Sequence, residues 1–183
     1  MARLEVPTSS DMTEEQRGIY EETKAGLRGY VPQPLKVWLK SPELARRAQK
    51  LGEFVRYQTS LPRRISELAI LVTARHWTAH YEWFAHKADA LKAGLSPTVI
   101  DAIAHCERPR FEKRDEKAVY DFCVSLHHTQ AVPEDLYRAV VEAVGEQATV
   151  ELVGLLGYYT LISMTLKAFD IGLPAGVSPE LVP

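Results

Sequence analysis

The chain has 183 residues, of which 46% are hydrophobic, so it can bury one substantial core and we expect a single domain over residues 1–183. Its 22 basic and 24 acidic residues are spread along the sequence, and the net charge of −2 argues against nucleic acid or an anionic membrane as a partner. No apolar run reaches the roughly 18–20 residues that span a bilayer, and the polar start MARLEVPTSSDMTEE does not resemble a signal peptide. We therefore expect a cytoplasmic protein.

The N-terminal third contains an arm and two helix signals. Residues 1–12 are expected to be irregular, and acidic residues in the first turn predict a helix over Thr13–Leu27. Ser41 followed by Pro42 is typical of a helix start, with a serine cap and proline at the first helical position. The apolar residues of this second helix recur at helical spacing and predict a face toward the core: Leu44, Ala48, Leu51 and Val55.

The central stretch, Arg64–Leu95, concentrates most of the side chains that could support chemistry. Its first part, Ile65–Ala74, is apolar and contains no glycine or proline, which predicts a buried helix. Its second part, Ala79–Ala93, mixes polar and aromatic residues and is followed by Gly94, a residue that commonly ends helices. We therefore expect two consecutive helices here.

The spacing of Glu67 and His86 requires a reversal between these helices if the two residues share a site. One straight helix would separate them by about 28 Å, at a rise of about 1.5 Å per residue. A break near residues 75–78 would let the second helix fold back, with Thr78 as its N-cap. Glu82 would then lie in the first turn, and His86 would follow four residues later on the same face.

The remaining sequence continues the helical pattern. Ser96–Cys106 repeats the serine-cap and proline start, and Asp115–His128 and Pro133–Gly145 are amphipathic. Gln147–Ala168 is the most apolar segment, and residues 169–183 form a proline-rich, irregular tail. Since no segment of useful length alternates like a strand, we expect an all-α fold of about seven or eight helices.

Several residues of the central stretch together resemble the core of the carboxymuconolactone decarboxylase and alkylhydroperoxidase D-like superfamily. They are Glu67, Ala79–Glu82, His86, Ala88 and the sequence LKAGLS at 91–96. The resemblance covers about residues 60–105, and GYYTLISMTLKAF at 157–169 resembles a later helix of one branch. It implies an alkylhydroperoxidase D-like helical bundle that assembles as a homo-oligomer, either a dimer, a trimer or a hexamer.

The peroxidase branch of this superfamily has a Glu, then a CxxC motif with a His before its second Cys, then another His. Glu67 and His86 match the first and last members of that pattern. Ala79 and Glu82 stand where the cysteines would be, and Tyr81 stands where the middle His would be. Peroxide reduction by such a pair needs a thiolate and a resolving thiol, so this chemistry is absent from the motif.

The two cysteines, Cys106 and Cys123, are too far apart in sequence to form a CxxC motif, and we expect both to be ordinary packing residues. A metal site is not expected either, because His80 and Glu82 are two residues apart and do not share a helix face. The zinc signature on a helix needs two histidines at i and i+4. The expected enzyme therefore uses no cofactor.

The decarboxylase branch resembles the chain more closely, because it has a carboxylate and a His at the positions of Glu82 and His86. Loss of CO₂ from a carboxylated lactone leaves electron density on the lactone oxygen, and a proton must then reach carbon. The resemblance implies that His86 is the general acid, that Glu82 tunes it, and that Glu67 orients it or is a second acid. The residues expected to bind the substrate are Arg75, His80, Tyr81, Trp83 and Tyr158.

These observations favour a carboxy-lyase-like enzyme that acts on a small carboxylated or lactone-type molecule, as in aromatic catabolism. Two alternatives stay open: a peroxidase-like oxidoreductase, and a non-catalytic protein of the same fold that binds small molecules or serves as a scaffold. His86 and Glu82 could also be no more than an i,i+4 pair within a helix. In every interpretation Glu67 needs a partner, because burying an unpaired charge is costly.

Overall fold

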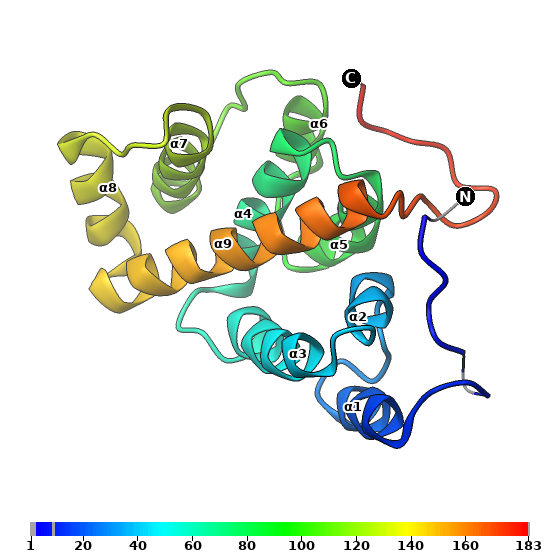
Figure 1. Ribbon diagram of the computed structural model, residues 1–183. Helices are drawn as coiled ribbons and strands as arrows, with labels where there is room; N and C mark the ends of the chain where they lie inside the picture. Colours follow the sequence, from blue (N-terminus) through cyan, green and yellow to red (C-terminus); the bar gives the residue numbers. More distant parts are fainter. Residues whose placement is uncertain (1–2, 9, 183) are drawn as a thin grey trace. The chain divides into compact units, whose positions relative to one another are not determined.

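The computed structural model of the chain describes residues 3–8 and 10–182, and in this part it contains nine α-helices and no strand (Figure 1). The helices are α1 (Glu14–Ala25), α2 (Gln33–Trp38), α3 (Pro42–Tyr57), α4 (Arg63–His76), α5 (His80–Lys92), α6 (Pro97–Ala104), α7 (Arg114–Thr129), α8 (Glu134–Val144) and α9 (Glu146–Ala168). The all-α prediction is confirmed, with one or two more helices than expected. Within the described residues, the N-terminal arm and the C-terminal tail are irregular, as predicted.

The chain divides into two compact units. The first comprises Met1–Thr59 and Thr165–Gly172, and the second comprises Ser60–Met164 and Leu173–Pro183. The expectation that the whole chain forms one domain stays a prediction.

The first unit contains α1, α2, α3 and the last turn of α9. Thr13 and Gln16 form a reciprocal capping box at the start of α1. The indole Nε1 of Trp38 donates a hydrogen bond of 2.9 Å to Thr165 Oγ1 on α9. The predicted inner face of α3 is rotated by about one residue, because the helix buries small side chains at positions 45, 48 and 52 together with position 55. Leu44 and Leu51 are consequently 43% and 47% exposed.

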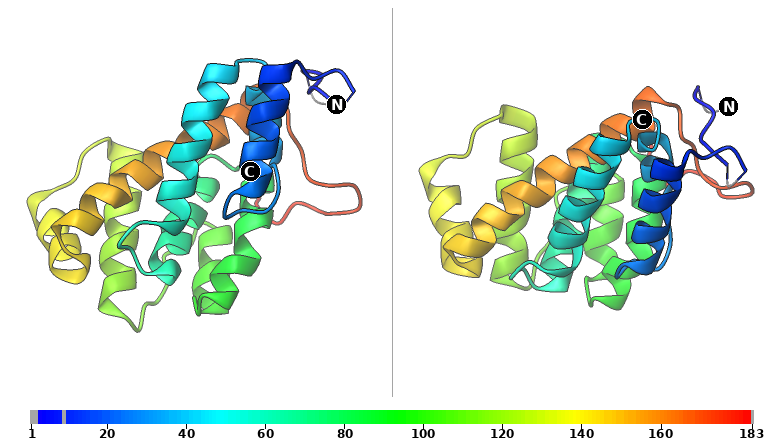
Figure 2. Two further views of the ribbon diagram at one scale, coloured as in Figure 1. Left: turned by 90° about the horizontal axis from the view of Figure 1, so that it is seen from below. Right: turned by 60° about the horizontal axis from the view of Figure 1, so that its bottom comes forward.

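The second unit is organised around α4, which packs against α5, α6 and α7. In turn α7 packs against α8, and both views of Figure 2 show these two helices side by side. All residues from Ile65 to Ala74 are buried, as the uninterrupted apolar run predicted. Because α4 is surrounded by other helices, a polar side chain on it must find its partner inside the protein. Glu67 and Thr73 are such residues, and both are 0% exposed.

The helix α9 corrects the expectation that no apolar run of the chain is long enough to span a bilayer. Its 23 residues are long and apolar enough to cross a membrane, and 56% of its most apolar window is buried inside the chain. The sequence pattern hides this run because weakly polar Ser, Thr, Gly and Tyr interrupt its aliphatic residues. Burial of this kind is also what the core helix of a soluble protein shows.

The reversal between α4 and α5 occurs where the sequence predicted it, but the backbone conformation of Thr78 differs from the predicted N-cap. Thr78 adopts a left-handed conformation with φ of 45°. Its N–H donates to the carbonyl of Arg75 at 2.9 Å, and the N–H of Ala79 donates to the carbonyl of Ala74 at 2.8 Å. These two bonds form a Schellman motif, which closes the C-terminus of α4. Thr78 therefore ends α4 and does not adopt the extended conformation of an N-cap. Ala79 occupies the N-cap position of α5 instead, without a side-chain hydrogen bond to the helix.

The same motif ends two more helices of this unit. At the end of α5 the left-handed residue is Gly94, with φ of 86°, and at the end of α6 it is Cys106, with φ of 59°. The corresponding long bonds join Leu95 N–H to the carbonyl of Ala90 at 3.0 Å, and residue 107 to residue 102 at 2.8 Å. Only glycine adopts this conformation without a steric penalty. Of these three helix ends, the one at Gly94 was therefore the only one that the sequence could predict.

We predict that Gly94→Ala lowers the free energy of unfolding by about 1 kcal/mol, because a left-handed conformation is penalised for residues with a Cβ. The new methyl group would meet no atom within 4 Å, so the effect isolates the backbone. Chemical denaturation measures it.

Gly18→Ala is the matched control, since this glycine lies inside α1 and its added methyl group is equally free. It should raise the free energy of unfolding by about 0.5–1 kcal/mol. The two glycines belong to different units, so a protein that unfolds in two steps would show each change in its own transition. Equal signs for the two substitutions would contradict this account of the reversals.

Candidate active site

The fold-back brings Glu67 of α4 and His86 of α5 into direct contact within one chain. The Nδ1 atom of His86 lies 2.7 Å from Glu67 Oε2, and its Nε2 atom lies 2.9 Å from Glu82 Oε1. A single imidazole is thus held between two carboxylates. The three residues are 0%, 1% and 5% exposed for Glu67, His86 and Glu82 respectively, so this cluster lies inside the protein and Glu82 is its least buried member.

Arg63 extends the cluster on the side of Glu67. Its Nη2 atom lies 2.6 Å from Glu67 Oε1 and 3.6 Å from Asp89 Oδ2. The result is a chain of alternating charges in the order Arg63, Glu67, His86 and Glu82. Sequence reasoning missed Arg63, although it stands four residues before Glu67 and so faces the same side of α4.

The hydrogen bonds of His86 determine how many protons the cluster holds. A neutral imidazole has one N–H, whereas two ionised carboxylates can only accept. For both ring nitrogens to donate to a carboxylate, the ring must be an imidazolium, which carries two N–H groups. Burial by itself would lower the pKa of His86, but Glu67 above all and then Glu82 outweigh it and raise that pKa.

Aromatic rings from α9 cover the imidazole. The Tyr159 ring meets His86 edge to face, with ring centroids 5.1 Å apart, and Tyr158 meets Tyr159 in the same manner at 5.4 Å. Both tyrosines are buried. The sequence analysis selected Tyr158 for the site, but the neighbouring Tyr159 is the residue that contacts the imidazole. A run of two tyrosines gives no signal that separates them.

The other predicted substrate-binding residues lie at different distances from the cluster. His80 and Tyr81 occupy the first turn of α5 and are half-buried, so they lie about one and a half turns before His86. Trp83 is buried, and its Nε1 atom donates to Glu180 Oε2 at 3.2 Å. Arg75 stands eight residues beyond Glu67, about 12 Å along α4 at the usual helical rise.

Arg75 takes part in a separate arrangement at the end of α4. Its Nε atom donates to Cys106 Sγ at 2.9 Å, and its Nη1 atom donates to Thr78 Oγ1 at 3.2 Å. It therefore contacts both left-handed residues that end α4 and α6. A cavity of about 310 Å³ adjoins this point and is lined in part by Arg75, Thr78 and Cys106.

The two cysteines differ in their surroundings, and both are free thiols. Cys123 is buried on α7, as expected of a packing residue, and burial raises the pKa of its thiol. Cys106 is exposed, and the expectation that it packs in the core is wrong. The reason is its position just after α6, in the turn that ends this helix.

A cluster of three histidines lies apart from Glu82 and His86. His76 stacks on His127 with ring centroids 4.8 Å apart and meets His128 at 5.1 Å. His127 Nε2 also lies 2.9 Å from Thr73 Oγ1. Burial, and then the neighbouring histidines, lower the pKa of His127 to about 4. Sequence reasoning missed this cluster, because His127 is far from His76 in the chain.

Solved structures of the same architecture exist. The debrominase Bmp8 in its apo form has a TM-score of 0.73 to this chain at 15% identity, covering 93% of this chain and 91% of that one. A cysteine-to-alanine variant of this debrominase in complex with 2,3,4-tribromopyrrole has a TM-score of 0.75 at 14% identity, with coverages of 96% and 95%. An uncharacterized peroxidase-related protein from Silicibacter sp. TM1040 has a TM-score of 0.76 at 14% identity, with coverages of 95% and 92%.

The chain has the alkylhydroperoxidase D-like fold. This confirms the fold that the central motif implied. No family model and no curated protein sequence matches the chain. Identities of 14–15% establish the fold alone, so the function must be argued from the residues of the site.

We predict that NMR titration of the imidazole of His86 gives a pKa above its ordinary value of 6.5, and that Glu67→Gln lowers it. A pKa raised by folding means that the native state holds the proton more tightly than the unfolded state. This contribution to stability is complete below about pH 6.5 and is lost as the pH rises through the folded pKa of His86.

His127 is the internal control, because its pKa is lowered to about 4 and its contribution has the opposite sign. Its neutral form is favoured by folding, so stability should fall as the pH drops from about 6.5 toward 4. His127→Gln should flatten this acid limb and leave the titration of His86 unchanged. A pKa of His86 below 6.5 would refute the assignment of an imidazolium to the cluster.

Proposed function

We propose that the chain is a cofactor-free, carboxymuconolactone decarboxylase-like enzyme that acts on a small carboxylated or lactone-type organic molecule. The observation that carries the proposal is the buried imidazole of His86, whose two nitrogens lie 2.7 Å from Glu67 Oε2 and 2.9 Å from Glu82 Oε1. A buried imidazole with a perturbed pKa between two carboxylates is typical of general acid–base catalysis. One of the solved structures with this fold is of an enzyme, the debrominase, which supports a catalytic role.

The contacts of His86 assign different tasks to the three residues. Both ring nitrogens already contact carboxylates, so the imidazole has no free nitrogen for a substrate. Glu82 is the outermost member and is the group that would touch the substrate. The proton moves from His86 Nε2 to Glu82 and then to carbon. Glu67 offsets the charge of the imidazole, and Arg63 fixes Glu67.

The reaction itself needs only this proton and a place for charge. The bond between the substrate carbon and its carboxylate breaks, and CO₂ leaves without the electron pair. That pair delocalises onto the lactone oxygen as an enolate, and Glu82 then protonates the carbon. We assign His80 and Tyr81 to the oxygens of the substrate, because they lie in the first turn of α5 beside Glu82.

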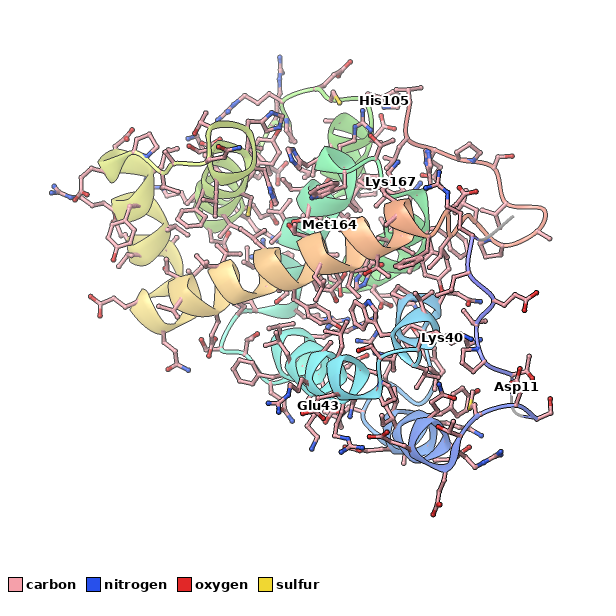
Figure 3. All side chains as sticks on the ribbon, viewed as in Figure 1. Asp11, Lys40, Glu43, His105, Met164 and Lys167 are labelled. Atoms are coloured by element: carbon pink, nitrogen blue, oxygen red, sulfur yellow. The ribbon has the colours of Figure 1, made fainter. Side chains whose placement is uncertain are left out.

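We also propose that the protein is cytoplasmic and forms homo-oligomers, as the family resemblance implies. Val150, Val153 and Met164 project from one face of α9 and are 73%, 48% and 50% exposed, and Figure 3 shows Met164 on this helix. An exposed apolar stripe of this kind suits contact with a second copy of the chain.

For a carboxylated lactone that releases CO₂ in a substrate screen, we predict that Glu82→Gln lowers kcat by about 10²–10⁴-fold, because the amide cannot deliver the proton. Glu82→Asp should recover part of the activity, and Glu112→Gln, which removes the same charge from an exposed loop, should have no effect. Release of CO₂ measures the rate, and circular dichroism checks the fold. Unchanged turnover in both Glu82→Gln and His86→Ala would exclude the mechanism.

A peroxidase-like oxidoreductase is the second candidate. The peroxidase-related neighbour has this fold, and the guanidinium of Arg75 donates to the exposed thiol of Cys106. A cation beside an accessible thiol is typical of reactive cysteines. In this case the chain would consume a peroxide in the presence of a thiol reductant. Substitution of Cys106, rather than His86→Ala, would then abolish the activity.

We predict that peroxide consumption by the wild-type chain does not exceed that of Cys106→Ser, with Cys123→Ser as the buried control. The measurement is the rate of peroxide loss with dithiothreitol as reductant. A rate that Cys106→Ser abolishes and Cys123→Ser preserves would favour the oxidoreductase. If neither CO₂ release nor peroxide loss occurs although small aromatic molecules bind, the non-catalytic alternative holds.

A further inference from the structure

A cavity of about 560 Å³ lies on a face of α5 that does not carry the catalytic cluster. One wall consists of Trp83, Lys87 and Leu91, which follow one another at intervals of four residues along α5. The rest of the lining comes from apolar residues of α6, from the polar residues Thr98, Asp101 and His105, and from the tail residue Glu180. The volume lies within the range of about 300–1,000 Å³ that is usual for sites of small ligands.

The polar end of this cavity consists of two donors that converge on one oxygen atom. Trp83 Nε1 donates to Glu180 Oε2 at 3.2 Å, and the ammonium group of Lys87 forms an ion pair with the same oxygen. The side chain of Trp83 is almost fully buried, so its N–H has a fixed direction. The cavity thus already holds a carboxylate, supplied by the protein itself.

Charged groups of both signs line the cavity. Asp101 lies 3.5 Å from His105, which follows α6 and is labelled in Figure 3, and the two form an ion pair only when the imidazole is protonated. The charge of Lys87 is compensated by Glu180. Burial opposes ionisation of Glu180, but the bonds from Lys87 and Trp83 prevail and lower its pKa, so it is ionised at neutral pH. Its replacement by another carboxylate would conserve the charge.

The contact of Glu180 is suited to displacement. The side chains of Lys87 and Glu180 are 36% and 47% exposed, and ion pairs so accessible to water contribute only about 0–1 kcal/mol. The next residue, Leu181, is 3% exposed and anchors the tail independently of the ion pair. Glu180 can therefore swing away while the tail stays attached.

We propose that this cavity binds a small aromatic monocarboxylate, whose carboxylate replaces that of Glu180 on Trp83 and Lys87. Its ring would lie against the apolar wall formed by Leu91, Pro97, Ile100 and Ala104. Glu180 is then an intramolecular competitor that sets the threshold concentration for binding. The site shares no residue with Glu67, Glu82 and His86, so it does not depend on the proposed reaction.

The test is isothermal titration calorimetry of the full chain with 1-naphthoate. Glu180→Gln removes the competing charge and should tighten binding by about fivefold or more, because a tethered competitor acts at a high local concentration. Lys87→Gln should weaken binding of 1-naphthoate to a comparable extent. Glu112→Gln, an exposed glutamate outside the cavity, should leave the dissociation constant unchanged.

Two further measurements distinguish recognition of the carboxylate from apolar adsorption and from binding at the catalytic cluster. The uncharged 1-naphthamide should bind more weakly than 1-naphthoate, and Glu180→Gln should not improve its binding. His86→Gln should leave the binding of 1-naphthoate intact, which keeps this result distinct from any failure of the catalytic proposal. The inference is overturned if 1-naphthoate binds neither the wild type nor Glu180→Gln, or if Lys87→Gln and Glu180→Gln leave its affinity unchanged.

Discussion

The placement of one buried imidazole between two carboxylates depends on a left-handed turn of the backbone. Because Thr78 closes α4 with a Schellman motif, α5 leaves in a direction that returns it along α4. Without that reversal, Glu67 and His86 would be separated by most of the length of a helix. The turn also fixes which faces meet, so that His86 finds Glu67 on one side and Glu82 on the other.

Such a cluster is a poor way to stabilise a protein. Removing several charges from water carries a penalty that their mutual attraction often only offsets, and apolar residues of similar volume would serve the core at least as well. The alternation of charges from Arg63 to Glu82 keeps each buried group compensated. The proposed acid–base reaction would give this penalty a purpose, because perturbed titratable groups cluster at functional sites.

The sequence allowed the helical class, the reversal and the three members of the cluster to be predicted. The family resemblance selected Glu67, Glu82 and His86, and helical geometry then required a reversal for Glu67 and His86 to share a site. The role of Thr78 could not be predicted, since a left-handed threonine has no sequence signal and the same residue is a good N-cap. The prediction that Leu44 faces the core was wrong for a different reason. Helical spacing gives the period of an apolar face but not its exact rotation toward the core.

Contacts between residues far apart in the chain could not be predicted from the sequence. Nothing local indicates that Arg75 turns toward Cys106 rather than toward Glu67, or that Trp83 donates to a glutamate almost a hundred residues later. The choice between Tyr158 and Tyr159 likewise depends on the rotation of α9. In each case the partner is set by tertiary packing, which short motifs do not encode.

The two contacts of His86 have a consequence for how protons travel. An imidazole can accept a hydrogen ion at one nitrogen while it releases another at the opposite nitrogen, so charge crosses the ring without displacement of its heavy atoms. Because rotation of the ring would break both contacts at once, the two carboxylates fix the orientation of the imidazole. The imidazole of His86 can thus pass protons between the enclosed carboxylate of Glu67 and the outer carboxylate of Glu82, with little rearrangement of the surrounding side chains.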